Sequence, residues 1–282
     1  MEAQGPNSEQ IEYWNKQAGP KWVANNAVMD ALIGKLGLAA LERAAPRAGQ
    51  RVVDVGCGGG QTSLQLAERV GPSGSVLGVD ISTPLLELAR EKARAAGRAN
   101  VRFENADAQT YAFQPGTVDL VFSRFGVMFF ADPDAAFANL ARAIRPGGRV
   151  AFVCWQPVVR NPWVSAPMAA LMKHVPPQAP PAPNAPGPFA FADPARVRGI
   201  LERAGFASLA VEPFESELVL GRNVDEATDF VSEMGPVGAA LAQAPESVRG
   251  AVAGSIREVL AGHQTPKGVA LGCAVWIVTG NR

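Results

Sequence analysis

Short apolar runs alternate with amphipathic stretches through the middle of the chain. Five runs have the length and the β-branched content of buried strands, and the stretches between them repeat apolar residues at the helical period. Strands are expected at the start of 51–60, at 75–80, just before 107, from 118 to a break at 123–126, and at 149–155. Helices are expected at 61–70, 83–96 and 132–148. This alternation predicts a mostly parallel sheet with helices on both faces.

Further elements flank this block. Two helices are expected before it, at 8–18 and 20–43, separated by Gly19 and Pro20. After it, the pattern predicts a helix from Pro194, a strand at 209–220, helices near 224–234 and 245–261, and a last strand at 272–279. The predicted fold is α/β: a doubly wound, mostly parallel seven-stranded sheet with an antiparallel last strand, N-terminal helices and a helical, proline-rich cap.

The first predicted strand runs into a turn at 56–60, where four of the five residues are glycine. Glycine has no Cβ and tolerates positive φ, so the backbone can curl beneath a bound molecule and direct its N–H groups toward it. A dinucleotide fingerprint of the GxGxxG type would need glycine or alanine at position 61, where this chain has Gln61. The pattern is DxGxGxG instead, and it begins at Asp54. A glycine turn that binds nothing is the alternative.

Acidic residues also follow the second and third predicted strands. Asp80 ends the strand 75–80, about twenty residues beyond the glycines, where a carboxylate can accept hydrogen bonds from both hydroxyls of a ribose. Asp107 and Ala108 follow the third strand. The carboxyl ends of neighbouring parallel strands line one crevice, and open α/β sheets bind ligands there.

With these motifs the chain resembles the class I S-adenosylmethionine-dependent methyltransferases, in the broad group that includes the quinone C-methyltransferases. The match runs over about 50–155 and again over 194–279, where LERAGF (201–206) and AVWIVT (274–279) fit the family. The resemblance implies S-adenosyl-L-methionine as the cofactor. It also implies the residues around it: Asp54, Gly56, Cys57, Gly58 and Gly60 at the methionyl part, Asp80 and Ile81 at the ribose and adenine, Asp107 and Ala108 at the adenine edge, and Ser123, Arg124 and Phe125 facing the sulfonium.

Prolines set the segment 156–188 apart, since they interrupt regular strands. A connection of this length in a compact domain is either functional or disordered, and we expect a cap over the methyl acceptor. The expected division is a helical arm at 1–48, a cofactor-binding core at 49–155, a proline-rich cap at 156–193, and the C-terminal part of the core sheet with a helical insertion at 194–282.

The composition of the chain narrows the range of possible methyl acceptors. The 282 residues are 48% apolar, and Lys plus Arg equals Asp plus Glu at 26 each, so no basic footprint for nucleic acid or an anionic membrane is present. The polar start of the chain and the lack of a long apolar stretch predict a cytoplasmic protein without a membrane span. Three scattered cysteines and two histidines give no metal spacing, and the cysteines are expected to be reduced. Whether the chain forms a homodimer is left open.

The expected acceptor is therefore a small, apolar molecule of aromatic or polyketide-like character. Large apolar side chains outside the cofactor motifs are the candidates to bind it, although about half of them are expected to be plain core. They are Trp14, Trp22, Met128, Phe129, Trp163, Phe189 and Phe191. No Asn-Pro-Pro-Tyr tetrapeptide follows the fourth strand, so a resemblance to the amino methyltransferases of nucleic-acid bases and glutamine is not supported.

No catalytic pair stands out in the sequence. His174 is the first candidate for a general base, and Arg124 for stabilising an acceptor anion. The alternatives are a surface histidine and an arginine paired with an acidic neighbour. O- or C-methylation is favoured over N-methylation. The competing functions are a nucleotide-dependent oxidoreductase, disfavoured by Gln61, and a non-catalytic protein that retains the cofactor fold.

Overall fold

The computed structural model describes residues 5–176, 182 and 184–282. The chain divides into two compact units. The first holds the described residues of Met1–Trp155, Asn184–Pro213 and Trp276–Arg282, and the second holds those of Gln156–Pro183 and Phe214–Val275. The four-part division expected from the sequence stays a prediction, and residues 177–181 and 183 of its cap lie outside the described residues.

One sheet with the strand order β3-β2-β1-β4-β5-β8-β6 runs through the described part of the chain, and the short β7 pairs with β8. The strands are β1 Arg51–Val55, β2 Ser75–Asp80, β3 Val101–Asn105, β4 Val118–Arg124, β5 Ile144–Trp155, β6 Ala207–Gly221, β7 Gln264–Thr265 and β8 Gly268–Asn281. The pairs β1–β2, β1–β4, β2–β3 and β4–β5 are all parallel. The predicted α/β class with its mostly parallel sheet is confirmed.

The last strand is antiparallel to β5. The amide of Gly147 donates to Arg282, whereas the amide of Gln156 donates to Ala274, so the residue numbers run in opposite directions along the two strands. This confirms the predicted antiparallel last strand, although it lies between β5 and β6. Sequence patterns predict strands more readily than their order, because the order depends on long-range pairing.

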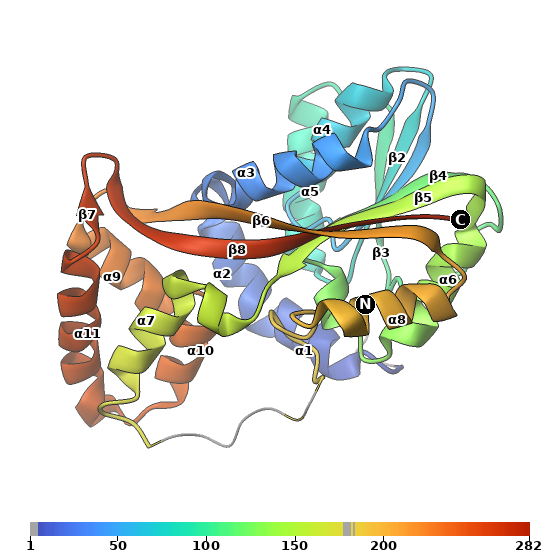
Figure 1. The fold of residues 1–282 in the computed structure, drawn as a ribbon. Coiled ribbons are helices and arrows are strands. Elements are labelled where there is room, and N and C mark those ends of the chain that lie inside the picture. Colours follow the sequence, from blue (N-terminus) through green and yellow to red (C-terminus); the bar gives the residue numbers. More distant parts are fainter. Residues whose placement is uncertain (1–4, 177–181, 183) are drawn as a thin grey trace. The chain divides into compact units, whose positions relative to one another are not determined.

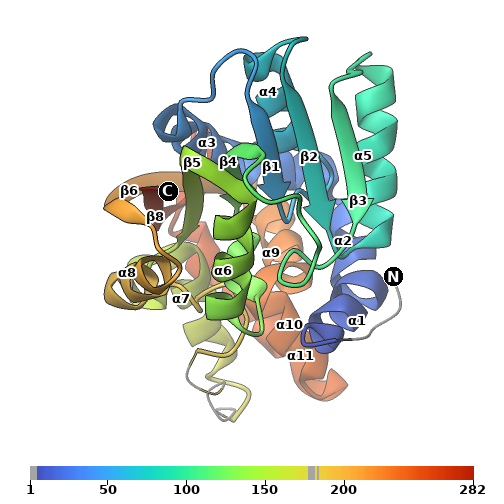
Figure 2. The same cartoon turned by 90° about the vertical axis from the view of Figure 1, so that its right-hand side faces the viewer.

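The strand order reverses between β1 and β4. The connections through α4 (Gln61–Val70) and α5 (Thr83–Ala95) lead in one direction along the sheet, and the connection through α6 (Pro133–Ala143) leads in the other (Figure 2). Right-handed crossovers in opposite directions place helices on opposite faces of the sheet. Such a reversal is where open α/β sheets bind ligands, outside the carboxyl ends of the strands.

Two predicted boundaries around α6 were wrong. The helix ends at Ala143 rather than at 148, and β5 begins at Ile144 rather than at Arg149. The Pro-Gly-Gly sequence at 146–148 lies inside β5, where the register with β4 shifts between Val118 and Leu120. The irregular pairing accommodates a proline and two glycines, which a sequence pattern would read as a stop.

Three helices precede the sheet instead of the predicted two: α1 Ser8–Lys16, α2 Ala18–Ala24 and α3 Asn26–Ala44. The predicted break at Gly19 was wrong, because Gly19 lies inside α2. A Cβ at Gly19 would stand 2.1 Å from the carbonyl oxygen of Trp14 and 2.6 Å from Oγ of Ser82. Glycine is therefore needed there for close packing of α2, and Pro20 is tolerated because it lies in the first turn.

Aromatic rings fill the core of the first unit beside β5. Phe137 of α6 lies 5.6 Å from Phe152 and 6.1 Å from Phe191, measured between ring centroids. After Phe191 the chain enters α8 (Pro194–Arg203), where Asp193 accepts a hydrogen bond from the amide of Ala195. This confirms the predicted helix after Asp193 and places it next to α6.

The second unit consists of helices and the long ends of β6 and β8. Its helices are the 3-10 turn η2 Val158–Arg160, α7 Pro162–Leu171, α9 Val224–Glu233, α10 Gly235–Gln243 and α11 Glu246–Ala261 (Figure 1). Helix α11 packs against both α7 and α9. The sequence predicted α9 and α11 but not α10, because a Gly-Pro pair at its start resembles a loop signal.

Candidate functional site

The glycine turn after β1 is held tightly at one end and is open in its middle. The amide of Gly56 donates to the carbonyl of Val79 over 2.8 Å, and a Cβ at Gly56 would stand 2.6 Å from Cα of Gly126. Gly58 has a φ of +52°, and apart from its chain neighbours no atom of the described residues lies within 4 Å of the position that its Cβ would take. The turn therefore needs glycine at both positions, and it leaves open space at Gly58 where a ligand can approach the backbone.

Asp54, the acid before the turn, is fully buried. Its Oδ2 atom accepts hydrogen bonds from Thr62 over 2.7 Å and from Ser63 over 2.6 Å, both in the first turn of α4. Its Oδ1 atom is buried without a hydrogen-bond partner among the described residues. A buried carboxylate oxygen without a donor is costly, so this atom marks a place where a ligand's donor would be stabilised.

Burial also shifts the protonation of Asp54. It raises the pKa of this carboxyl group to about 6, although the hydroxyls of Ser63 and Thr62 and the charge of Arg124 pull the pKa down. A ligand cation next to Oδ1 would favour the ionised form and lower the pKa again. The electrostatics of the site therefore favour a positively charged group beside Asp54.

Asp80 at the end of β2 is tied to two loops. Its Oδ2 accepts a hydrogen bond from the amide of Gly58 and its Oδ1 accepts one from the amide of Ser82, each over 2.8 Å. The carboxylate is thus fixed between the glycine turn and the start of α5. Each carboxylate oxygen has a second lone pair, so Asp80 can still accept hydrogen bonds from a diol. The following residue, Ile81, is partly exposed.

Asp107, which follows β3, is buried in a polar cluster. Its Oδ1 accepts a hydrogen bond from the amide of Gln109 over 2.9 Å, and its Oδ2 accepts one from Asn7 Nδ2 over 2.8 Å. Ala108 beside it is also buried. Asn7 immediately precedes α1. A residue near the start of the described chain therefore contacts Asp107, which the sequence predicted as a site residue at the end of β3.

The end of β4 faces the glycine turn. Ser123 is buried, and its hydroxyl donates to the carbonyl of Val55 over 2.7 Å. Phe125 has a φ of +61°, which is costly for a bulky residue and is found where a site fixes the backbone. Its ring stacks on Trp155, with 4.4 Å between the ring centroids. The strained residue therefore lies at the end of the strand next to β1.

The side chain of Arg124, the last residue of β4, forms an ion pair and a hydrogen bond. Its guanidinium donates to Asp30 of α3 over 3.3 Å and to the side chain of Gln61. Asp30 also pairs with Lys92 of α5 over 2.9 Å. Of the two roles left open by the sequence, the structure shows the arginine paired with an acidic neighbour. A direct role of Arg124 on an acceptor stays a prediction.

Comparison with known proteins agrees with this geometry. Residues 52–148 match the methyltransferase domain family. They carry the glycine turn, Asp80, Asp107 and the end of β4. These residues form a class I S-adenosylmethionine-dependent methyltransferase domain.

The relatives of the domain come from several bacteria. The aklanonic acid methyltransferase DauC of Streptomyces sp. strain C5 is 37% identical over 47% of this chain and 63% of its own length. A demethylmenaquinone methyltransferase of Thermus thermophilus is 39% identical over 42% of this chain and 53% of its own length. The chain thus spans less than two thirds of the length of each of these relatives.

A solved structure shows the same fold. The YcgJ protein of Bacillus subtilis aligns with 88% of this chain and 97% of its own, with a TM-score of 0.56 and 17% sequence identity. At this identity the likeness concerns the fold alone. It extends beyond the methyltransferase domain to most of the chain.

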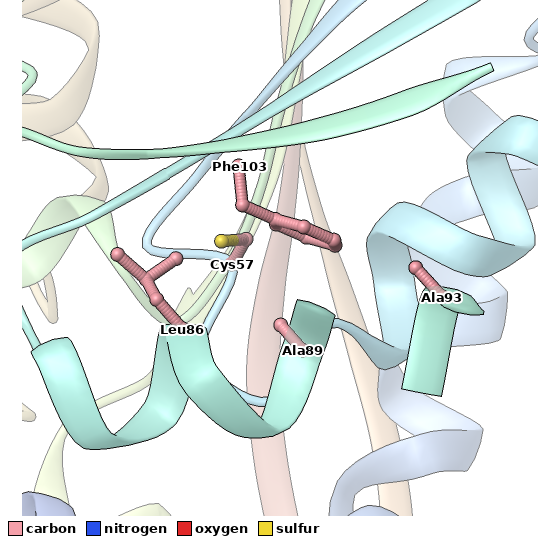
Figure 3. Packing of buried hydrophobic residues seen from close by; sticks show 5 residues of the cluster. All are labelled: Cys57, Leu86, Ala89, Ala93 and Phe103. Carbon is pink, nitrogen blue, oxygen red and sulfur yellow. The ribbon is translucent and has the colours of Figure 1, made fainter. Parts of the chain in front are cut away.

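Cys57, which the resemblance had placed at the cofactor, points its side chain into the core of the methyltransferase domain. It is buried in a cluster with Phe103 of β3 and with Leu86, Ala89 and Ala93 of α5 (Figure 3). Burial raises the pKa of its thiol, so the thiolate is disfavoured. Any contact of Cys57 with a cofactor would therefore come from its backbone.

Three of the predicted acceptor residues, Trp14, Trp22 and Phe129, lie together in the first unit. The ring of Trp14 makes edge contacts with Trp22 and Phe129, with centroid distances of 5.6 Å and 5.4 Å. Met128 and Phe191 are almost fully buried in the first unit, and Phe189 is partly exposed. This division fits the expectation that some of the set is plain core.

Trp163 and His174 belong to the second unit. The indole of Trp163 donates to Asn161 over 3.1 Å. Nε2 of His174 lies 2.8 Å from Oγ of Ser255, so the histidine joins the end of α7 to α11. Their roles as acceptor-binding and catalytic residues stay predictions.

Sequence reasoning missed the residues that support the site. Thr62 and Ser63 hold Asp54, Asp30 holds Arg124, and Asn7 holds Asp107. Thr62 and Ser63 could have been found, because hydroxyls in the first turn after a glycine loop lie close to the preceding strand. Asp30 and Asn7 act on residues 94 and 100 positions away, and no local pattern points to such partners.

Other kinds of site find less support in the described part of the chain. Among these residues no group of three or more histidine, cysteine or acidic side chains could hold a metal ion, and no helix is long and apolar enough to cross a membrane. A surface hollow of about 490 Å³ lies along α5 and β3 and is lined by arginines rather than by Asp54, Asp80 or Asp107. It is therefore separate from the cluster of strand ends described above.

Proposed function

We propose that this protein transfers a methyl group from S-adenosylmethionine to an oxygen or carbon atom of a small, apolar, aromatic or polyketide-like molecule. The observation that carries the proposal is the unpartnered, buried Oδ1 atom of Asp54 beside an open glycine turn. A site for a dinucleotide would instead direct its backbone amides at a pyrophosphate and would not need a buried carboxylate at this position.

The residues present fit the cofactor. Asp54 would receive its ammonium group, the open space at Gly58 would hold its methionyl part, and Asp80 would accept hydrogen bonds from its ribose hydroxyls. Asp107 and Ala108 would meet the adenine. This assignment satisfies the carboxylate oxygen of Asp54 that the described part of the chain leaves without a donor.

The bound cofactor supplies an electrophilic methyl group on a sulfonium, whose leaving group is already activated. The protein then has to align the acceptor and to exclude water. Well-held reactants gain effective molarities of about 10⁵ to 10⁸ M, so positioning alone can supply much of the rate. The stacked pair of Phe125 and Trp155 offers a rigid apolar wall at the end of β4, next to the glycine turn.

The class of acceptor rests on two arguments. The relatives named above are, by their names, methyltransferases of aklanonic acid and of demethylmenaquinone, a quinone. The aromatic contacts of Trp14 with Trp22 and Phe129 provide apolar surface in the first unit, and an apolar acceptor suits the balanced charge of the chain.

A binding experiment tests the cofactor assignment. The product S-adenosylhomocysteine should stabilise the purified protein in a thermal shift assay, and at about 100 times its dissociation constant the gain is about 2.7 kcal/mol. NADH and NADPH at the same concentrations should give no shift. Asp80→Ala should weaken S-adenosylhomocysteine at least about tenfold in calorimetry, since charge-assisted hydrogen bonds are lost. Stabilisation by a nicotinamide alone would contradict the proposal.

An acceptor screen tests the reaction itself. Purified protein is incubated with S-adenosylmethionine and panels of phenols, quinones, polyketides and amines, and formation of S-adenosylhomocysteine is measured. Turnover is expected with an aromatic or polyketide acceptor. Turnover with amines alone would reject the preference for oxygen or carbon, and cofactor binding without turnover on any panel would favour a non-catalytic protein.

A further inference from the structure

A cluster of three buried polar side chains joins the start of α1 to the ends of two strands. Asn7, Asp107 and Gln109 are each less than 10% exposed, at 4%, 7% and 7%. Asn7 lies 100 residues from Asp107 in the sequence. Buried polar side chains are stable in a folded protein only when their hydrogen bonds are satisfied. Each hydrogen bond in the cluster therefore restricts the orientation of the other two side chains.

The amide of Asn7 is fixed in one orientation. Its Oδ1 accepts a hydrogen bond from the backbone amide of Ala131 over 2.7 Å, beyond the end of β4. Since that partner can only donate, the Nδ2 group of Asn7 must point the other way. There it donates to Asp107 Oδ2 over 2.8 Å and to Gln109 Oε1 over 3.3 Å.

Asp107 is thereby held from both sides. One oxygen accepts from Asn7 and the other accepts from the backbone amide of Gln109, so rotation of the carboxylate would break a buried hydrogen bond. Each oxygen keeps one further lone pair. A carboxylate held in this way presents a fixed acceptor at the end of β3, and an acceptor selects ligands that carry a donor.

We propose that Asn7 is a positioning residue that fixes Asp107 to accept the 6-amino group of the cofactor's adenine, so that Asn7 contributes to selectivity for the base. The inference rests on the proposed function, because it takes the ligand to be S-adenosylmethionine. It goes further by assigning base selectivity to a residue outside the methyltransferase domain at 52–148.

The chain provides a matched control. Asn15 also anchors α1, since it donates to the carbonyl of Ile81 over 2.9 Å and accepts from the amide of Thr83 over 2.9 Å. It has no hydrogen bond to Asp107 or Gln109 among the described residues. Asn15→Ala therefore loosens the same helix without releasing Asp107.

The test compares two ligands by calorimetry, S-adenosylhomocysteine and S-inosylhomocysteine, in which a carbonyl replaces the 6-amino group. The wild-type protein should prefer the adenosine form by about tenfold or more, the range expected for a hydrogen bond to a charged group. Asn7→Ala should weaken the adenosine form and bring this ratio close to one. Asn15→Ala should weaken both ligands by the same factor and keep the ratio.

Two results would overturn the proposal. A wild-type protein that binds both ligands equally would show that Asp107 does not read the amino group, while leaving the proposed function intact. An Asn7→Ala variant that keeps the wild-type ratio would show that Asn7 only anchors the helix. Failure of the folded wild-type protein to bind either ligand would instead reject the proposed function, and the inference with it.

Discussion

The two units differ in how they treat their most buried polar side chains. In the second unit Asn161 is fully buried, and its Nδ2 donates to the carbonyls of Gln156 and Pro157 while its Oδ1 accepts from Ala274 and Trp163. In the first unit Asp54 is as deeply buried, yet one of its oxygens has no donor among the residues that the structure describes. Asn161 therefore satisfies its hydrogen bonds within its own unit, whereas Asp54 leaves one oxygen unsatisfied, and we propose that a ligand supplies the missing donor.

This difference separates a structural polar group from a functional one. Burial alone does not distinguish them, because both side chains are shielded from water. An unsatisfied charged group does, since a native fold tolerates a buried carboxylate oxygen without a partner chiefly where function requires it. The hydroxyl oxygens of Ser216 and Ser232 in the second unit also lack a hydrogen-bond partner among the described residues, but a neutral hydroxyl costs less to bury than a charge. The comparison predicts that changes at Asp54 act on cofactor binding. For His174, the candidate general base in the second unit, the measurement that decides is turnover.

The largest expected effect concerns His174 of the second unit. If it acts as the general base, His174→Gln should lower kcat by about 10² or more and leave the affinity for S-adenosylhomocysteine unchanged. Turnover of the acceptor found in the screen, together with calorimetry, measures both. His263→Gln is the matched control, because His263 is the other histidine of the chain and is exposed. Equal turnover in the two variants would reject His174 as the base.

The next effect concerns the charge of Asp54. Asp54→Asn should weaken S-adenosylhomocysteine by about ten- to a hundredfold, because it removes the negative charge opposite the ligand's ammonium group. Asp119→Asn serves as the control, since Asp119 accepts the amide of Arg51 at the opposite end of β1 and should not affect the ligand. Unchanged affinity in folded Asp54→Asn, measured by calorimetry, would remove Asp54 from the site.

The smallest effect is a dependence of stability on pH without ligand. Burial raises the pKa of Asp54 from 3.8 to about 6, so its protonated form is favoured in the folded state. This contribution to stability is full below pH 3.8 and is lost as pH rises through 6. The loss amounts to roughly 3 kcal/mol for this shift.

Urea denaturation between pH 4 and 7.5 measures the free energy of unfolding. The wild-type protein should lose stability over this interval relative to Asp54→Asn, which has no carboxyl group to titrate. Parallel curves for the two proteins would show that the pKa of Asp54 is not raised in the folded state. Added S-adenosylhomocysteine should reduce the difference, because its ammonium group stabilises the charged form.

The sequence by itself determined the features that depend on local periodicity and on single residues at strand ends. The apolar runs and glycine turn predicted β1, α4 and the parallel sheet, and the acids Asp54, Asp80 and Asp107 were found because each lies at or just after the carboxyl end of a short buried strand. Parallel strands bring their carboxyl ends to one edge, so the neighbourhood of these residues followed from topology rules without coordinates.

Only the tertiary structure decided which polar groups are satisfied and by what. The side-chain donor to Asp107 is Asn7, just before α1, and the acidic partner of Arg124 is Asp30 of α3, both far away in sequence. The need for glycine at position 19 of α2 likewise comes from its close approach to Trp14 and Ser82. Hydrogen bonds of this kind form only when the two groups lie about 3 Å apart, so they depend on how distant elements pack. Packing of this kind produces no periodic pattern in the sequence from which the contact could be predicted. The same holds for the free oxygen of Asp54, since the absence of a donor is a property of everything packed around it.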